Sequence, residues 1–419
     1  MKRTNITSGT IVKITLLLTT AIISVGGAAL APALPAIGEA FEESTAGGLG
    51  VRLVLTIPAF FVALSAPFTG YVVDKIGRKS VLSFSLLLSA LAGLSAFFAA
   101  TLTVLLTGRA VLGIAVAGVM VSVTTLVADY YTGEERSRMM GYQAGVAGLS
   151  DTVLILAVGF LADLTWRASF LIYLFPLLVL PLVLVVIREP KAEDQCEENP
   201  PPVGDPGTCA GASVAEESDS QDQTSANQHV PIKFIAFIYG LTILAEILFT
   251  IAPVQLPFYL QDSAGASASQ IGLALSLMSL AFAVSATLYG RVASRFDHIS
   301  VLLIAFSLFG LGFVLISLTN STVALYLGLI VTGFGLGMLI PNLYVWLANE
   351  VPQAIRGRVL GGFTTALYLG QFLSPLVSQP LTIALDVQYT ILIAGLVMLA
   401  LVPLFFVTRR QLRLLAVSH

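Results

Sequence analysis

The sequence predicts an all-α, multi-pass membrane protein with twelve transmembrane helices in two six-helix halves. The first reason is composition, since 56% of the 419 residues are hydrophobic and only 11% are charged. A soluble domain carries about 25% charged residues and could not hide so many apolar side chains. The second reason is the length of the apolar runs, which suits helices rather than barrel strands. The third is an internal repeat that relates the two halves. These features exclude a single soluble domain, a coiled coil, a disulfide scaffold and a disordered chain.

Twelve apolar segments reach the length of about 20 residues that a helix needs to cross a bilayer. The first follows Lys2, Arg3 and Lys13 and ends in small residues, a pattern similar to a signal peptide. The many apolar segments behind it favour an uncleaved first helix. The predicted spans are 11–33, 50–73, 80–100, 102–127, 138–162, 168–187, 234–260, 269–293, 299–318, 322–347, 357–380 and 387–408.

A polar stretch, residues 188–231, separates the sixth segment from the seventh. It contains three consecutive prolines and ten acidic residues, and such a composition cannot bury a core. We interpret it as a flexible linker, with a binding or regulatory role as the alternative. It holds Cys196 and Cys209, which we interpret as free thiols. The predicted organisation is an N-terminal half, an acidic linker, a C-terminal half and a tail, over residues 1–187, 188–231, 232–408 and 409–419.

Basic residues predict the orientation of the chain. Arg109 lies inside a segment, and Arg52 and Arg167 lie near segment ends on one side. The other eighteen of the 21 Lys and Arg residues fall on the opposite side: in the N-terminus, the loops after even-numbered helices, the linker and the tail. Since cytoplasmic loops are enriched in Lys and Arg, both termini and the linker are predicted to be cytoplasmic.

The internal repeat has an offset of 220 residues. Similar residues recur at this spacing in the loops after the second and eighth helices, in the loops after the fourth and tenth helices, and within those helices. The pairs are Gly70 with Gly290, Asp74-Lys75 with Ser294-Arg295, Arg136 and Arg138 with Arg356 and Arg358, Gly141 with Gly361, and Gly113 with Gly333. Two halves in parallel orientation place a substrate site at their interface, near the bilayer midplane.

These residues carry a resemblance to the major facilitator superfamily. The segment after the second helix fits the family's G-x-x-x-D-[RK]-x-G-R-[RK] motif through Gly70, Asp74, Lys75, Gly77, Arg78 and Lys79. Arg109 followed by Gly113 is similar to the family's second motif, which is common in proton-driven drug exporters. Trp166 and Arg167 resemble the family's start of the sixth helix. The resemblance covers essentially the whole chain and implies the major facilitator fold and a transport function.

The loop motif has a mechanical interpretation. At the cytoplasmic end of the second helix, the Asp74 carboxylate can accept hydrogen bonds from neighbouring helix N-termini and pair with Arg136 or Arg138. Such a contact would lock one conformation and break in the other, so we expect a conformational switch. In the alternative, the bases Arg78 and Lys79 only fix the topology.

Three charged residues are predicted inside the membrane. Arg109 lies about 10 Å below the outer surface, at 1.5 Å per residue, and either faces the protein interior or extends outward. Asp151 and Glu246 lie near the midplane, one in each half. Buried carboxyl groups without a fixed partner can bind and release protons near neutral pH, whereas a neutral acid could be purely structural. We predict that Glu246, Asp151 and Arg109 couple protons to transport. Glu246 is the first candidate because Arg109 is expected nearer Asp151.

Aromatic and amide side chains recur in the second half and suit a cavity for ligands of mixed polarity. Interface anchoring is the alternative for the aromatic ones. The substrate-cavity candidates are Tyr239, Gln255, Asn342, Trp346, Tyr368 and Gln371. No metal cluster, nucleotide loop or nucleophile–base arrangement is found, so we expect no enzyme, metal or cofactor.

The predicted function is secondary active transport by alternating access in the cytoplasmic membrane of a prokaryote, as proton-coupled export of amphipathic small molecules. One alternative is uptake or facilitated diffusion of a metabolite, such as an organic anion held by Arg109. A distant alternative is a receptor or scaffold that transports nothing. The expected partners are a small-molecule substrate, protons and the lipid bilayer. We expect a monomer that binds no nucleic acid.

Overall fold

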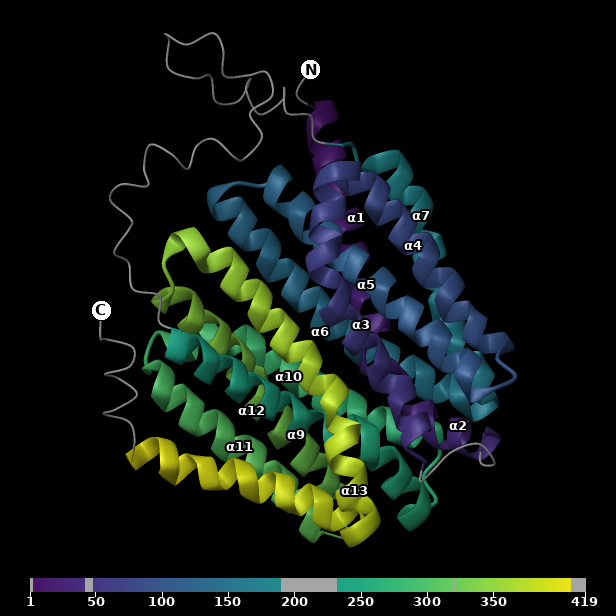
Figure 1. Cartoon of the computed structure of the whole chain (residues 1–419), viewed down its shortest axis with the longest axis vertical. Coiled ribbons are helices and arrows are strands. Elements are labelled where there is room, and N and C mark those ends of the chain that lie inside the picture. Colours follow the sequence, from purple (N-terminus) through teal and green to yellow (C-terminus); the bar gives the residue numbers. More distant parts are fainter. Residues whose placement is uncertain (1–2, 42–47, 190–231, 320, 408–419) are drawn as a thin grey trace.

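The computed structural model describes residues 3–41, 48–189, 232–319 and 321–407, and their regular structure is helical (Figure 1). The predicted linker beyond Glu189, with Cys196 and Cys209, and the tail lie outside the described residues. The N-terminal half comprises α1 (Arg3–Val25), η1 (Ala28–Ala33), α2 (Leu34–Ala40), α3 (Leu49–Ile76), α4 (Arg78–Ser95), η4 (Ala96–Phe98), α5 (Leu102–Tyr130), α6 (Gly133–Leu164), η5 (Trp166–Leu174) and α7 (Phe175–Val186). The C-terminal half comprises α9 (Ile232–Ala264), α10 (Ala268–Ala293), α11 (His298–Leu318), α12 (Thr322–Glu350) and α13 (Gln353–Val407).

Twelve membrane crossings are present in the described part of the chain, as predicted. Ten helical segments are long and apolar enough to cross a bilayer, and a bent pair at the N-terminus forms another crossing. The last segment, α13, has 55 residues and is interrupted at Asp386, where φ is 72°. At 1.5 Å per residue it would be about 80 Å long, more than twice the bilayer core of about 30 Å. It therefore supplies two crossings.

The first crossing differs from its predicted span of 11–33. α1 already begins at Arg3, and the chain bends by 41° after Val25 before η1 and α2 carry it on to Ala40. Gly26 and Gly27 lie at the break and support helix poorly. Proline at the start of α2 then suits a first helical turn, because the missing N–H would have no helical partner there.

The two halves lie side by side, with the purple-to-teal half against the green-to-yellow half (Figure 1). Across the boundary, α6 packs on α10 and α3 packs on α13. Small residues allow the first contact: a Cβ atom on Gly159 would lie 2.8 Å from the Ala268 carbonyl oxygen and 3.1 Å from the Gly272 Cα atom. Such close backbone approach is how helices associate in lipid, where apolar burial gives little driving force.

The internal repeat is visible in the packing. A Cβ atom on Gly113 would collide with the carbonyl oxygen of Pro58, and one on Gly333 would collide with that of Met278. Pro58 and Met278 are themselves 220 residues apart, the offset that separates the two glycines. The same close helix contact therefore occurs once in each half.

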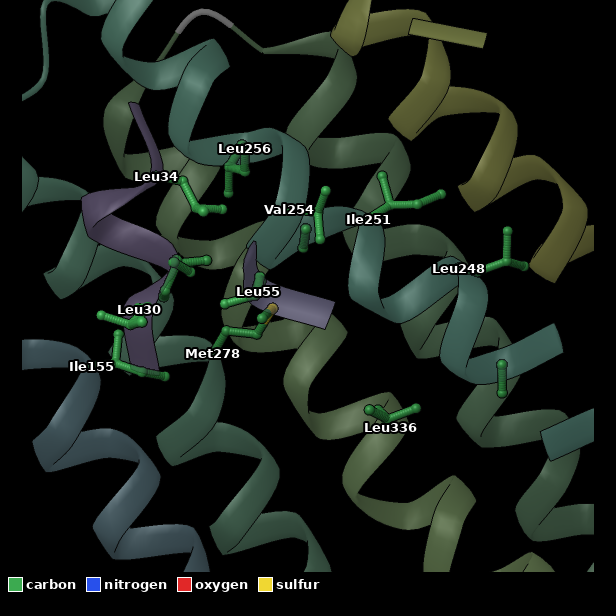
Figure 2. Close-up of a cluster of buried hydrophobic side chains, with 14 of the residues drawn as sticks. Leu30, Leu34, Leu55, Ile155, Leu248, Ile251, Val254, Leu256, Met278 and Leu336 are labelled. Carbon is green, nitrogen blue, oxygen red and sulfur yellow. The ribbon is translucent and has the colours of Figure 1, made fainter. Parts of the chain in front are cut away.

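Buried apolar side chains from both halves form one continuous cluster across the boundary. Figure 2 shows Leu55 of α3 and Ile155 of α6 near Val254 of α9, Met278 of α10 and Leu336 of α12. We call the end of the molecule where α7 ends and α9 begins the linker end, and the opposite end, which carries α2, the far end. The cluster lies between these ends.

Candidate functional site

A cavity of about 300 Å³ lies between the two halves. Its wall comes from α1, α3, α5 and α6 on one side and from α9, α10, α12 and α13 on the other. Asp151 of α6 and Glu246 of α9 both line it, so the structure brings together the two predicted midplane acids. The volume is at the lower end of the range for pockets that bind small molecules.

Glu246 is 3% exposed and is held at the wall by α13. The side-chain amide of Gln371 donates a 3.2 Å hydrogen bond to the Glu246 carboxyl group. Gly370 permits this approach, because a Cβ atom there would lie 2.6 Å from the Cβ atom of Glu246. One turn further along α13, the Ser374 hydroxyl donates a 2.7 Å hydrogen bond to the Ile247 carbonyl oxygen. α13 therefore holds both the Glu246 side chain and the backbone next to it, and among the described residues no ion pair to this carboxyl group is found.

Asp151 is half-buried on α6 and faces Ser24 of α1. The Ser24 hydroxyl donates its 3.2 Å hydrogen bond to the carbonyl oxygen of Ala147, one turn before Asp151. Tyr368 of α13 lies within electrostatic reach of both carboxyl groups, and its hydroxyl lies 3.7 Å from the Met120 sulfur. Tyr368 thus lies near both acids.

Arg109 takes the first of its two predicted orientations: it faces the protein interior and is fully buried. Its Nε atom donates a 2.8 Å hydrogen bond to the Val54 carbonyl oxygen, and its Nη1 atom donates to the Tyr173 hydroxyl. Tyr173 in turn donates a 3.0 Å hydrogen bond to the Val25 carbonyl oxygen. These bonds join α3, α5, η5 and α1 behind the cavity wall. Arg109 was expected nearer to Asp151 than to Glu246, and the described contacts of its guanidinium are with Val54 and Tyr173.

Of the predicted cavity residues, Tyr368 and Gln371 line the cavity and four do not. Tyr239 donates a 2.5 Å hydrogen bond to the Val359 carbonyl oxygen near the linker end. Asn342 bonds to His298, and Trp346 stacks on the same imidazole ring with centroids 5.8 Å apart. Asn342 and Trp346 therefore pack inside the C-terminal half and do not line the cavity in this structure.

Gln255 was also predicted to line the cavity, but it lies in a contact between the halves at the far end. The Nε atom of Arg52 on α3 donates a 2.8 Å hydrogen bond to the Gln255 amide oxygen on α9. The Gln255 amide nitrogen donates to Ser378 and Gln379 of α13, at 3.0 and 3.2 Å. The guanidinium carbon of Arg52 also lies 4.2 Å from the centre of the Phe258 ring. This group of residues, the far-end latch, is buried or half-buried.

Two more polar contacts join the halves at the far end. Gln261 donates to Glu39 at 2.5 Å, and the Ser269 backbone N–H lies 3.3 Å from both Asp163 carboxylate oxygens. Beside the cavity, the Thr152 hydroxyl lies 3.4 Å from the Ser279 hydroxyl and Tyr368 contacts Met120. The polar contacts described across the boundary thus lie at the cavity and at the far end. The acids Glu39 and Asp163 attracted no prediction, because single charges near segment ends are common.

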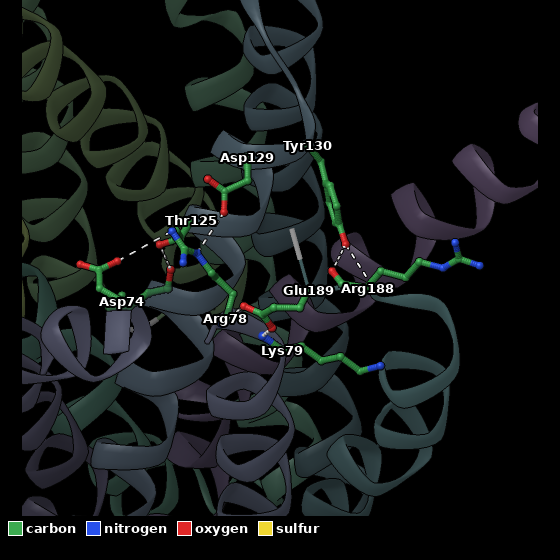
Figure 3. A network of polar contacts seen from close by, with 9 residues as sticks. Asp74, Arg78, Lys79, Thr125, Asp129, Tyr130, Arg188 and Glu189 are labelled. Atoms are coloured by element: carbon green, nitrogen blue, oxygen red, sulfur yellow. Dashed lines mark hydrogen bonds and ion pairs between the residues drawn. The ribbon is translucent and has the colours of Figure 1, made fainter. Parts of the chain in front are cut away.

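The loop motif lies at the linker end, within the N-terminal half (Figure 3). Arg78 contacts two acids: its Nε atom lies 3.1 Å from an Asp129 oxygen, and its Nη2 atom lies 3.9 Å from an Asp74 oxygen. The Asp129 side chain is 16% exposed and that of Asp74 is 74% exposed. Asp129 is therefore the better-sheltered partner of the arginine.

Glu189 closes the N-terminus of α4. Its carboxylate accepts hydrogen bonds from the backbone N–H groups of Arg78 and Lys79 at 2.6 and 2.9 Å (Figure 3). The sharp approach to these groups needs Gly77, whose φ of 105° is a conformation that other residues rarely adopt. An anion at a helix N-terminus is favoured by the unpaired N–H groups there. Both Asp129 and Glu189 were missed, because neither falls within the recognised motif.

The predicted pairing of Asp74 with Arg136 or Arg138 is absent among the described residues. Arg138 instead pairs with Glu134, one turn away on α6, at 2.7 Å. The two arginines lie on an exposed stretch of α6, whereas Asp74 near the end of α3 is 3.9 Å from Arg78, the first residue of α4. Partners four residues away in the sequence therefore take the place of the predicted contact between loops.

Comparisons with known proteins agree with this architecture. The family model described as Major Facilitator Superfamily matches residues 16–232 and 234–416. The class H tetracycline resistance protein of Pasteurella multocida is 25% identical over 369 residues, covering 87% of each chain. Multidrug resistance protein 1 of Bacillus subtilis (strain 168) is 24% identical over 399 residues, covering 93% of this chain and 92% of that one.

Solved structures share the fold. The inward-open xylose transporter XylE from E. coli superimposes with a TM-score of 0.74 at 13% identity, covering 94% of this chain and 95% of that chain. The nucleoside transporter NupG gives a TM-score of 0.73 at 15% identity, covering 94% of this chain and 99% of that chain. The family model matches nearly the whole length of this chain. The chain therefore belongs to the Major Facilitator Superfamily and is a multi-pass membrane transporter.

Proposed function

We propose that this transporter exports amphipathic small molecules by proton-coupled alternating access. The observation that carries the proposal is the central cavity, where each half contributes one carboxyl group, Asp151 or Glu246, to a mostly apolar wall. Both named relatives that cover most of the chain are resistance proteins, which supports export. The structural neighbours include sugar and nucleoside transporters and support only the fold.

The contacts between the halves support an alternating-access cycle. In the described conformation the far-end latch and the bonds of Glu39 and Asp163 hold the far end together. With the linker end on the cytoplasmic side of a prokaryotic plasma membrane, as the basic residues predict, this state receives substrate from the cytoplasm. Export then requires the far-end contacts to break and the halves to close at the linker end.

The two cavity carboxyl groups supply the proton step. A carboxyl group in a nonpolar wall is more easily neutralised than one in water, by a proton or by a bound positive group. Gln371 can serve Glu246 in either state, since an amide offers both donors and an acceptor. The choice of Glu246 before Asp151 no longer rests on Arg109, which contacts neither acid. We therefore assign proton binding to both carboxyl groups and test each one.

The alternative of an organic anion held by Arg109 loses its basis. Arg109 is absent from the cavity wall and already donates to Val54 and Tyr173. Uptake or facilitated diffusion of another metabolite remains the competing function, and it differs from export in its response to an imposed pH gradient.

Transport in inverted membrane vesicles tests the proposal. A pH gradient, acidic inside, is imposed, and accumulation is measured for a panel of fluorescent amphipathic compounds. We expect gradient-dependent accumulation with the wild type and its loss with Glu246→Gln, while exchange of substrate without a gradient survives. The matched control is Glu135→Gln, which removes an exposed acid near the start of α6. If both Glu246→Gln and Asp151→Asn accumulate substrate like the wild type, coupling through these acids is wrong.

A further inference from the structure

We propose that the cavity binds a lipophilic organic cation, a compound with one positive charge on an apolar, aromatic body. This inference rests on the proposed transport function and adds the chemical class of the substrate. It is carried by the charges, the polar groups and the aromatic surfaces of the cavity wall.

The charges of the wall are all of one sign. Asp151 and Glu246 line the cavity, and its wall, formed entirely by described residues, contains no Lys, Arg or His. The polar groups beside the two carboxyl groups are neutral: the Ser24 hydroxyl lies beside Asp151, and the Gln371 amide donates to Glu246. A buried carboxylate is costly unless it is paired. A cationic ligand supplies the missing partner, whereas an anionic ligand adds repulsion.

The nearest intramembrane bases are held by other groups. Arg109 donates to Val54 and Tyr173 behind the wall, and Arg52 donates to Gln255 at the far end. The negative charge of the cavity therefore comes from the carboxyl groups of its wall. Neither arginine lines the cavity, so a cationic ligand can pair with these carboxyl groups.

The rest of the wall suits an apolar body. Phe249, Met278, Phe282, Leu336 and Ile340 are among its residues. Aromatic faces attract cations as well as apolar groups. The neutral polar side chains of the wall are few, so a polyhydroxylated sugar would leave most of its hydroxyl groups without partners. This separates the expected ligand from the sugars carried by some proteins of the same fold.

The number of acids sets the charge of the ligand. One positive charge neutralises one of the two carboxylates, and a proton can neutralise the other. A dication would occupy both groups and leave no site for a proton. A single charge therefore agrees best with proton-coupled transport.

Binding of probes that differ in charge tests this inference. The full-length protein is placed in nanodiscs of phosphatidylcholine, and equilibrium dialysis measures binding of tetraphenylphosphonium, tetraphenylborate and the smaller cation benzyltrimethylammonium in separate experiments. Empty nanodiscs correct for partition into lipid. We expect saturable binding of at least one cation and none of the borate, which has nearly the same shape as the phosphonium. Equal binding of borate and phosphonium, or binding of neither cation, overturns the inference.

Variants connect the binding to the two acids. Glu246→Gln and Asp151→Asn are each expected to weaken cation binding by about tenfold or more, and the double variant is expected to abolish it. Glu135→Gln, on the same helix as Asp151 but outside the cavity, should bind like the wild type. Unchanged binding by the folded single variants contradicts the inference. If the double variant fails to fold, the single variants and the comparison of tetraphenylphosphonium with tetraphenylborate still test the inference.

The same probes separate this inference from the proposed function. If the cation binds through the two acids but no pH gradient drives its movement, the cation site stands and proton-coupled export fails. If a pH gradient drives export of a neutral or anionic compound through Glu246 while neither cation binds, export stands and the cation class is wrong.

Discussion

The Nε atom of Arg109 on α5 donates a 2.8 Å hydrogen bond to the carbonyl oxygen of Val54 on α3. In a regular helix this carbonyl would accept from the N–H four residues later, but residue 58 is proline and has no N–H. The buried arginine thus serves a carbonyl that the helix itself leaves without its usual donor. Because Pro58 also lines the cavity, Arg109 supports the cavity wall from behind.

Arg109→Lys should therefore lower both stability and transport. A lysine cannot donate to Val54 and Tyr173 from the positions of a planar guanidinium, and unpaired buried groups cost about 1–3 kcal/mol each. The measurement is the thermal unfolding midpoint in detergent together with transport in vesicles. Tyr173→Phe, which removes one partner of Arg109, should cost less than Arg109→Lys. Tyr142→Phe is the control, since Tyr142 is 61% exposed. An unfolding midpoint of Arg109→Lys equal to the wild type would contradict this role.

The two acids that contact Arg78 should respond differently to neutralisation. Asp74→Asn should change stability by less than about 0.5 kcal/mol, because exposed ion pairs contribute little. It should still reduce transport if the motif biases one of two conformations. Asp129→Asn should lower stability more, because its contact with Arg78 is shorter and less exposed. Wild-type transport by a stable Asp74→Asn protein would remove Asp74 from the mechanism.

Gly159→Ala should weaken the closed far end. The added Cβ atom would lie 2.8 Å from the Ala268 carbonyl oxygen, so α6 and α10 must separate. Labelling of Leu260→Cys, a buried position of α9 outside the far-end latch, by a thiol reagent added at the far end on a cysteine-free background should accelerate several-fold with this change. The control is Gly141→Ala on the same helix, where a Cβ atom would meet nothing within 4 Å. An equal labelling rate with Gly159→Ala and Gly141→Ala would show that the contact does not hold the far end.

The predicted orientation can be tested with the two native cysteines. Cys196 and Cys209 are the only cysteines of the chain, and both fall in the predicted cytoplasmic linker. An impermeant maleimide should label them in inverted vesicles and leave them unlabelled in intact cells. Ser263→Cys, on a cysteine-free background, is the control for the exposed far end and should show the reverse. Labelling of the native pair in intact cells would reverse the proposed topology.

The number of crossings, the repeat and the cavity acids could be predicted from the sequence. Apolar runs of membrane length have few alternatives, and a charge in such a run is costly enough to stand out. For this reason Asp151, Glu246 and Arg109 stand out in the sequence as charged residues within apolar segments. The repeat likewise placed a site between the halves, where both carboxyl groups are found.

The direction in which each side chain points could not be predicted. Helices such as α9 and α12 are apolar on nearly all sides, so the sequence does not show which face meets the cavity. Gln255, Asn342 and Trp346 lie outside the cavity in this structure, and each is on a helix that also borders another neighbour. The partners of Arg109 and the role of Glu189 depend on contacts between distant segments, which no local pattern reports.

Proton movement caused by substrate tests the central claim most directly. The purified protein is reconstituted into liposomes that carry an internal pH indicator, and a transported compound is added without an imposed gradient. We expect a substrate-dependent change in internal pH with the wild type and with Glu135→Gln. The change should be strongly reduced or absent with Glu246→Gln and with Asp151→Asn, although substrate still exchanges across the membrane. Transport by the wild type without any pH change, or an unaltered pH change in both cavity variants, would contradict proton coupling through Glu246 and Asp151.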